Sequence, residues 1–121
     1  MPFVEITGVA QQENQRRELS AGLTRTLAAA FGIAPEIVTI YFVPVAASDY
    51  AHAGVLSPPG EIRNFIKVHA FPREVALKRR AAQAMTAAFV AATQADPKNV
   101  VIYFFDRDPQ SVSHGGILAS D

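Results

Sequence analysis

Residues 35–43, PEIVTIYFV, and residues 97–105, PKNVVIYFF, decide the fold because they are two versions of one segment, 62 residues apart. The same offset aligns residues 2–54 with residues 64–116 without a gap, and twelve of the aligned pairs are identical. Self-similarity at a fixed spacing indicates a repeated supersecondary unit. The sequence therefore predicts a single domain, residues 1–121, made of two pseudo-repeats, 2–54 and 64–116, joined by a loop at 55–63.

Each repeat has the pattern of a strand, a helix and a second strand. Residues 3–9 and 65–71 are rich in Phe, Val and Ile, as strands prefer. Apolar residues then recur every three or four positions, which predicts one packed helix face per repeat. These residues are Leu19, Leu23, Leu27, Ala30 and Phe31 in the first repeat, and Ala81, Met85, Ala88, Phe89 and Ala92 in the second. The two quoted segments follow as apolar runs without alternation, typical of strands covered on both faces.

This order of elements predicts an α/β (α+β) fold in which two β-α-β repeats form a four-stranded mixed sheet. Right-handed crossovers place both helices on the same face of such a sheet. A chain of 121 residues has no further layer for the opposite face. We therefore expect subunits to associate through their sheets, as a symmetric ring allows.

Composition excludes several classes of function. Basic and acidic residues both number 11, so no charge imbalance suggests nucleic acid as a partner. The chain has no cysteine, and its three histidines show no ligand spacing, so we expect no metal site. No segment has the roughly 20 apolar residues of a membrane span, and the start lacks the pattern of a signal peptide. We expect a cytoplasmic protein with no membrane partner.

Pro2 is the candidate catalytic residue. A proline at the start of a strand has an ordinary explanation, because edge strands and first strand positions tolerate it. If Met1 is removed, however, the Pro2 nitrogen becomes a secondary amine. An α-amino group titrates near ~8, and apolar surroundings lower its pKa towards neutrality, where a general base works best.

With Met-Pro at its start and a duplicated strand-helix-strand unit, the chain resembles the tautomerase superfamily over nearly its whole length. It is more similar to doubled members, in the cis-3-chloroacrylic acid dehalogenase, malonate semialdehyde decarboxylase and 4-oxalocrotonate tautomerase groups, than to macrophage migration inhibitory factor. The resemblance implies the tautomerase/MIF-like fold, a homotrimer, catalysis by the amino-terminal proline, and no cofactor.

The resemblance also implies three substrate-binding residues. Arg73 stands where doubled relatives place an arginine that binds the substrate carboxylate, and a guanidinium suits that role. Its repeat mate is Gln11, which fits one site per chain. Tyr103 matches a tyrosine of the dehalogenase-like group, and Tyr50 falls where 4-oxalocrotonate tautomerase has a pocket phenylalanine. The alternatives are a solvated arginine and two packing tyrosines.

Other family residues do not match. The histidine and glutamate with which the cis dehalogenase activates water correspond to about Leu27 and His114, which weakens dehalogenation and hydration. His52, His69 and His114 have ordinary explanations in their loop, strand and tail positions, and we do not expect them to act as acids or bases.

Three hypotheses follow. The leading one is a cofactor-independent keto-enol tautomerase acting on a small 2-oxo or 2-hydroxy-enoic acid, with Pro2 as the general base. The second is a decarboxylase, hydratase or dehalogenase of a three-carbon acid that uses protonated Pro2. The third is a non-catalytic ligand-binding or assembly module, which applies if Met1 is retained.

Overall fold

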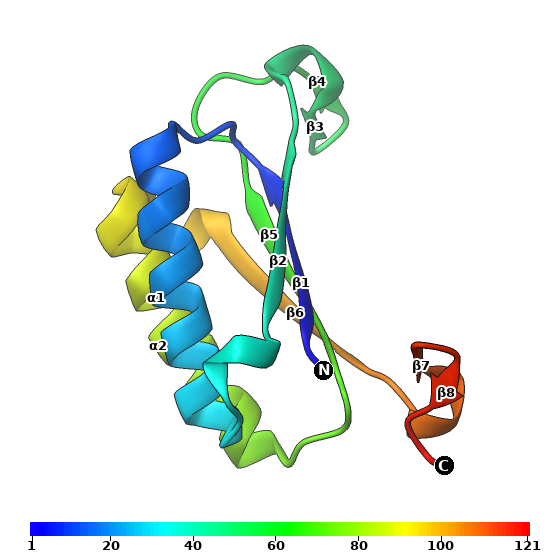
Figure 1. Ribbon diagram of the computed structural model, residues 1–121. Helices are drawn as coiled ribbons and strands as arrows, with labels where there is room; N and C mark the ends of the chain where they lie inside the picture. Colours follow the sequence, from blue (N-terminus) through cyan, green and yellow to red (C-terminus); the bar gives the residue numbers. More distant parts are fainter.

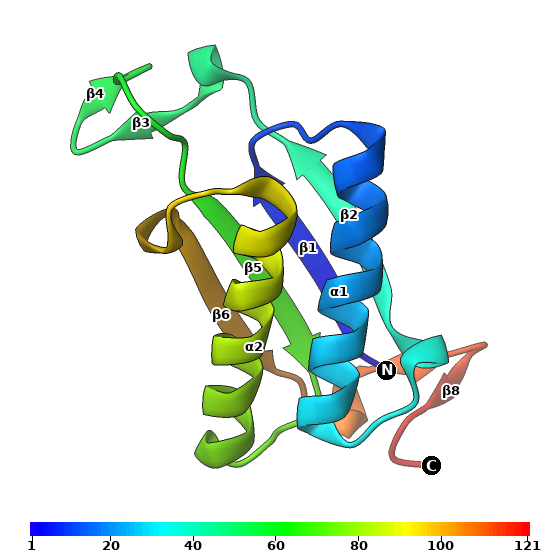
Figure 2. The same cartoon turned by 90° about the vertical axis from the view of Figure 1, so that its left-hand side faces the viewer.

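The computed structural model of the protein describes all 121 residues and has two layers, a sheet and a pair of helices (Figures 1 and 2). The main sheet contains β1 (Phe3–Gly8), β2 (Thr39–Pro44), β5 (Asn64–Ala70) and β6 (Val100–Asp106). Helices α1 (Glu13–Phe31) and α2 (Val75–Thr93) lie side by side on one face of this sheet. The predicted fold class is confirmed.

The strand order of the sheet is β2-β1-β5-β6. Within each repeat the two strands are parallel, β1 with β2 and β5 with β6. The repeats meet at the antiparallel pair of β1 and β5, in which Phe3 lies opposite His69 and Ile6 lies opposite Ile66. The sheet is therefore mixed, and each repeat contributes one interior strand and one edge strand.

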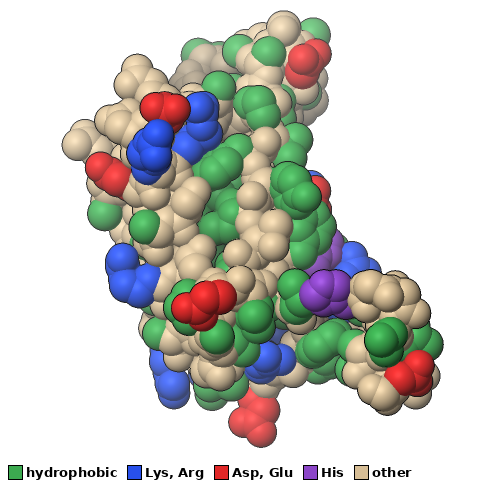
Figure 3. All heavy atoms as spheres, viewed as in Figure 1, with side chains coloured by type: hydrophobic (Ala, Val, Ile, Leu, Met, Phe, Trp, Pro, Cys, Tyr) green, Lys and Arg blue, Asp and Glu red, His purple; other side chains and the backbone are tan.

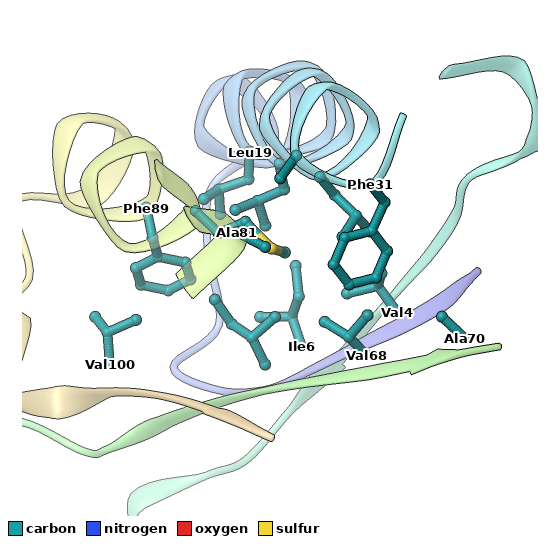
Figure 4. Packing of buried hydrophobic residues seen from close by; sticks show 14 residues of the cluster. Val4, Ile6, Leu19, Phe31, Val68, Ala70, Ala81, Phe89 and Val100 are labelled. Carbon is teal, nitrogen blue, oxygen red and sulfur yellow. The ribbon is translucent and has the colours of Figure 1, made fainter. Parts of the chain in front are cut away.

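The core lies between the helices and the sheet (Figure 4). Leu19, Leu23 and Leu27 of α1 are buried, as are Met85 and Phe89 of α2. They pack with alternate residues of the interior strands, which point to this face because side chains alternate along a strand. The helical faces predicted from the spacing of apolar residues are confirmed.

Both helices end on a residue in the left-handed conformation. Gly32 follows α1 with a φ of 66°, and Gln94 follows α2 with a φ of 60°. Their backbone N–H groups donate hydrogen bonds to Ala28 and Val90 of the last helical turn. Glycine adopts this conformation freely, whereas glutamine adopts it at a cost. The two helix ends are thus equivalent in backbone and different in side chain.

Short elements complete each repeat. Four 3₁₀ helices are η1 (Pro35–Ile37), η2 (Ala47–Asp49), η3 (Pro97–Asn99) and η4 (Pro109–Ser111). One small hairpin pairs β3 (Ala51–His52) with β4 (Val55–Leu56), and the other pairs β7 (Ser113–His114) with β8 (Ile117–Leu118). The connector at 55–63 therefore begins with β4. The hairpins project from opposite ends of the sheet, the second beside the chain's N-terminus (Figure 1).

The sheet face away from the helices is open. Tyr41 of β2 and Tyr103 of β6 are 58% and 53% exposed, and Phe105 is also exposed. The apolar runs of β2 and β6 predict coverage on both faces, but a single chain covers only one. This difference has a physical reason, since the chain contains two helices and both lie on the same side.

Candidate active site

Pro2 lies immediately before β1, an interior strand with β2 on one side and β5 on the other. The residue is buried, whereas Met1 is 50% exposed. Its carbonyl oxygen accepts a hydrogen bond from the N–H of Thr39 at 3.2 Å. By the alternation of side chains, Pro2 belongs to the same face as the buried Val4 and Ile6. β1 is therefore not an edge strand, but Pro2 still has the ordinary explanation of a proline at the start of a strand.

A cavity of about 540 Å³ adjoins this end of the sheet. Met1 lines it from one side, next to Phe71, which follows the end of β5. The C-terminal segment lines the rest with Val112, Ser113, His114, Ile117, Leu118, Ala119 and Asp121. Its wall is mainly apolar, as small-molecule sites commonly are. The bond between Met1 and Pro2 thus lies at the edge of an apolar cavity.

Arg73 lies at the same end of the sheet as Pro2. Strand β5 runs antiparallel to β1 and ends at Ala70, three residues before Arg73. The Nη1 group of Arg73 donates hydrogen bonds to the carbonyl oxygens of Phe71 at 2.9 Å and Pro72 at 3.2 Å. Its guanidinium carbon lies 5.0 Å from the centre of the Phe31 ring. No carboxylate pairs with Arg73, so its charge is held in place without being neutralised.

The two tyrosines lie away from this end within one chain. Tyr103 is opposite Lys67 in the middle of the sheet, on the open face, and stacks on Phe65 with ring centres 5.9 Å apart. Tyr50 precedes β3 at the opposite end of the molecule, where its hydroxyl accepts a hydrogen bond from the N–H of Arg63 at 3.2 Å. A single chain brings Pro2 and Arg73 to one end but does not bring Tyr50 to them.

A polar network lies on the open face beside Pro2. The Nε2 atom of His69 is 3.0 Å from a carboxylate oxygen of Glu5. Its Nδ1 atom is 2.8 Å from Nη2 of Arg107 and 3.2 Å from Nε of the same residue. The imidazole stacks between Phe3 and Phe105, with ring centres 5.1 and 4.6 Å away. Aromatic rings therefore hold the histidine between a carboxylate and a guanidinium.

The hydrogen bonds assign the tautomer of His69. A guanidinium can only donate, so Nδ1 of His69 accepts from Arg107 and carries no proton. The proton is then on Nε2, from which it is donated to Glu5. The imidazole is neutral in this arrangement, and Arg107 has no direct carboxylate partner.

The whole chain superimposes closely on solved structures of fused 4-OT. A wild-type fused 4-OT, an asymmetric trimer, matches with a TM-score of 0.90 at 20% identity, over 98% of this chain and 96% of that one. The chain has the fused 4-OT fold. A member of the cis-3-chloroacrylic acid dehalogenase family matches with a TM-score of 0.82 at 17% identity, over 96% of this chain and 82% of that one.

Macrophage migration inhibitory factor of Toxoplasma gondii shares the architecture, with a TM-score of 0.80 at 19% identity over 96% of this chain and 98% of that one. No protein family profile and no curated protein sequence matches the chain. The resemblance to the tautomerase superfamily inferred from the sequence is therefore supported at the level of the fold.

Within the fused 4-OT fold, sequence reasoning missed the network of Glu5, His69 and Arg107. Its members are 64 and 38 residues apart, and only the register of β1, β5 and β6 brings them together. The available signal was the position of His69 near the end of the predicted strand 65–71, and the antiparallel pairing with β1 places that end next to Pro2. Without the register, that signal does not distinguish His69 from any strand residue.

Two further observations concern metals and membranes. No group of three or more histidine and acidic side chains lies close enough together to hold a metal ion. Neither helix combines the length and the apolar character that crossing a membrane requires.

Proposed function

We propose that this protein is a cofactor-independent tautomerase of the tautomerase superfamily, acting on a small 2-oxo or 2-hydroxy-enoic acid. One observation carries the proposal: the buried Pro2 lies at the sheet end where Arg73 and an apolar cavity also lie. The shared fold with fused 4-OT structures supports it. A base, a carboxylate-binding cation and an apolar pocket are the parts that proton transfer next to a carboxylate requires.

The proposed base is the Pro2 nitrogen after removal of Met1. Because Met1 lines the cavity and is bonded to Pro2, removal of Met1 would leave the secondary amine next to the cavity. The amine takes a proton from the 2-hydroxyl group or from carbon and returns it at another carbon of the conjugated chain. No side chain needs to supply the base.

Arg73 is the proposed partner of the substrate carboxylate. Two backbone carbonyls and the Phe31 ring fix its guanidinium, and one Nη group and Nε have no partner within the chain. A preorganised guanidinium binds a carboxylate with little further loss of side-chain freedom. In that position its charge stabilises the enolate that forms during proton transfer.

The proposed assembly is a homotrimer. Solved fused 4-OT structures are trimers, and the open sheet face of this chain exposes Tyr41, Tyr103 and Phe105. Exposed apolar surface of this kind is typical of faces that associate. In such an assembly Tyr50 reaches a Pro2 site only from a neighbouring subunit, because the two residues lie at opposite ends of one chain.

The first test is the intact mass of the purified protein, followed by assays of phenylenolpyruvate and 2-hydroxymuconate tautomerisation. We expect a mass that lacks one methionine and measurable turnover. Arg73→Gln should raise KM by about tenfold or more, since a charge-assisted hydrogen bond is lost. Arg80→Gln, an exposed arginine on α2, is the matched control and should leave KM unchanged.

Retention of Met1 in active protein would contradict a role for the Pro2 amine, because its nitrogen is then an amide. Turnover of malonate semialdehyde without tautomerase activity would favour the decarboxylase alternative. If Arg80→Gln raised KM as much as Arg73→Gln does, Arg73 would act only through the net charge of the protein and not by binding the carboxylate.

A further inference from the structure

Phe31 connects the hydrophobic core to the guanidinium of Arg73. It is the last residue of α1, is 7% exposed, and packs in the core with Val4 and Val68 (Figure 4). Its ring centre lies 6.1 Å from that of Phe104 in β6. The guanidinium carbon of Arg73 lies over the same ring, 5.0 Å from its centre. The core therefore fixes the ring, and the ring contacts a cation.

Hydrogen bonds within the chain hold only one of the three guanidinium nitrogens of Arg73. Nη1 donates to the carbonyl oxygens of Phe71 and Pro72, the two residues before it. A planar group anchored at one nitrogen can still pivot about it. The Phe31 ring supplies the second constraint, because a guanidinium stacks on an aromatic face and is attracted by it. Nε and Nη2 remain free, and together they form an edge that fits both oxygens of one carboxylate.

Packing alone also accounts for an apolar residue at position 31. The last turn of α1 lies on the sheet, and Phe31 belongs to the core cluster between them. A leucine of similar volume would fill that role with a modest loss of stability. Only the contact with Arg73 needs an aromatic face. Substitution of Phe31 by leucine therefore separates the two roles.

The repeat places this pair at one end of the sheet only. The repeat mate of Arg73 is Gln11. The mate of Phe31 is Thr93, which lines the same cavity as Gln11 at the other end. Neither mate has a charge or an aromatic ring, and the Thr93 hydroxyl donates to a backbone carbonyl of its own helix. The cation and its ring thus both lie at the end that has Pro2, where apolar side chains border basic ones (Figure 3).

We propose that Phe31 is a positioning residue of the carboxylate site, whose ring holds the Arg73 guanidinium so that its Nε–Nη2 edge is presented to the substrate. The inference rests on the proposed function, in which Arg73 binds the substrate carboxylate. It adds a residue that acts through Arg73 and does not touch the substrate. Ordering a flexible side chain on binding weakens affinity by about two- to tenfold, and a guanidinium that is already held avoids that loss.

The test is the binding of sorbate, a six-carbon unsaturated monocarboxylate that has no oxo or hydroxyl group and cannot undergo keto-enol tautomerisation. In NMR titrations Phe31→Leu should raise the Kd of sorbate by about three- to tenfold. A fluorinated phenylalanine at position 31 keeps the ring and weakens its attraction for a cation, so the Kd should rise by about two- to threefold without loss of the core packing.

Phe89→Leu is the matched control. Phe89 is a fully buried ring of α2 in the same core, and it has no contact with a guanidinium. This substitution should destabilise the core in a similar way and leave the Kd of sorbate within about 1.5-fold, because the two sites are independent. An increase in Kd equal to that of Phe31→Leu would overturn the proposal, since general loosening of the core would then explain both.

A double-mutant cycle shows whether the ring acts through Arg73. In an Arg73→Gln background, Phe31→Leu should change the Kd by less than about 1.5-fold, because the guanidinium that the ring holds is gone. An equal effect of Phe31→Leu in both backgrounds would contradict the proposal and would mean that the ring shapes the cavity directly. An unchanged Kd in both variants at position 31 would contradict it as well.

The same titrations separate this inference from the proposed function. If the wild type does not bind sorbate, or if Arg73→Gln leaves its Kd unchanged, the carboxylate role of Arg73 fails and the role of Phe31 fails with it. If Arg73→Gln weakens binding and Phe31→Leu does not, only the role of Phe31 fails. Turnover by Pro2→Ala reports separately on the base, because the binding of sorbate needs none.

Discussion

The repeat relates the two ends of the β1–β5 pair position by position, but the residues at the two ends differ. At one end Pro2 lies at the position that the repeat pairs with Asn64 at the other. Asn64 is 3% exposed, and its side-chain oxygen accepts from the N–H of Val9 at 2.9 Å. A β-carbon on Gly8 would lie 2.2 Å from that oxygen, so the glycine makes room for the amide. A cavity adjoins each end, but no side-chain hydrogen bond closes the Pro2 end in this way.

A duplicated unit can divide two tasks between its ends. Asn64 connects β5 to the segment after β1 and closes its end with a partly buried hydrogen bond, which is stabilising because an N–H shielded from water is costly when it is unpaired. While Met1 is attached, Pro2 has no N–H that needs a partner. Its end can remain open without leaving a buried donor unpaired. We infer that one end stabilises the fold and the other end performs the chemistry.

The largest expected effect is on turnover at the open end. Pro2→Ala replaces the secondary amine by a primary amine that no ring holds in position. The substitution should lower kcat by about 10²-fold or more, within the range of general base catalysis. Its free energy of unfolding should change by less than about 1 kcal/mol. Steady-state kinetics and urea denaturation measure the two quantities. A large loss of stability with intact kcat would reverse the roles assigned to the ends.

The next effect is on stability at the closed end. Asn64→Ala leaves the N–H of Val9 without its partner and should lower the free energy of unfolding by about 2–3 kcal/mol. The kcat of tautomerisation should stay within about twofold, because the substitution lies at the far end of β1 from Pro2. Urea denaturation checks the first value. If instead kcat falls and stability does not, Asn64 belongs to an active site.

Gly8→Ala tests the same closure from the opposite strand. The new β-carbon collides with the Asn64 amide and should cost about 1–3 kcal/mol of stability. In an Asn64→Ala background the collision is absent, so the cost should fall below about 1 kcal/mol. A double-mutant cycle by urea denaturation measures this coupling. Additive effects of the two substitutions would mean that the glycine serves another purpose.

The smallest effect concerns the helix ends. Gly32 and Gln94 occupy equivalent left-handed positions. Gly32→Ala should destabilise the protein by about 1 kcal/mol, and Gln94→Gly should stabilise it by a similar or smaller amount. Thermal unfolding of the two variants gives shifts of opposite sign. Shifts of the same sign would show that contacts of the side chains outweigh backbone conformation.

Much of the fold could be predicted from residues close together in the chain. The spacing of Leu19, Leu23 and Leu27 predicted a buried helix face, and the structure confirms it. The apolar segment around Tyr103 predicted a strand, and the structure confirms that as well. The sequence did not predict that one face of this strand is exposed in a single chain. Burial depends on which other layers cover the sheet, and the strand's own residues do not show that. One chain assembles only part of the site expected from the sequence. Pro2 and Arg73 lie at one end of the sheet, and Tyr50 lies at the other.

The repeat, the type and order of the elements and the proline at the start of one repeat can be read from the sequence alone, because they depend on local periodicity and on backbone preference. Only the tertiary structure decided that Glu5, His69 and Arg107 meet, and that Arg73 and Arg107 lie on opposite sides of one sheet end. The physical reason is register. Pairing between distant strands places residues opposite one another, and a shift by one residue would turn every one of these side chains to the other face.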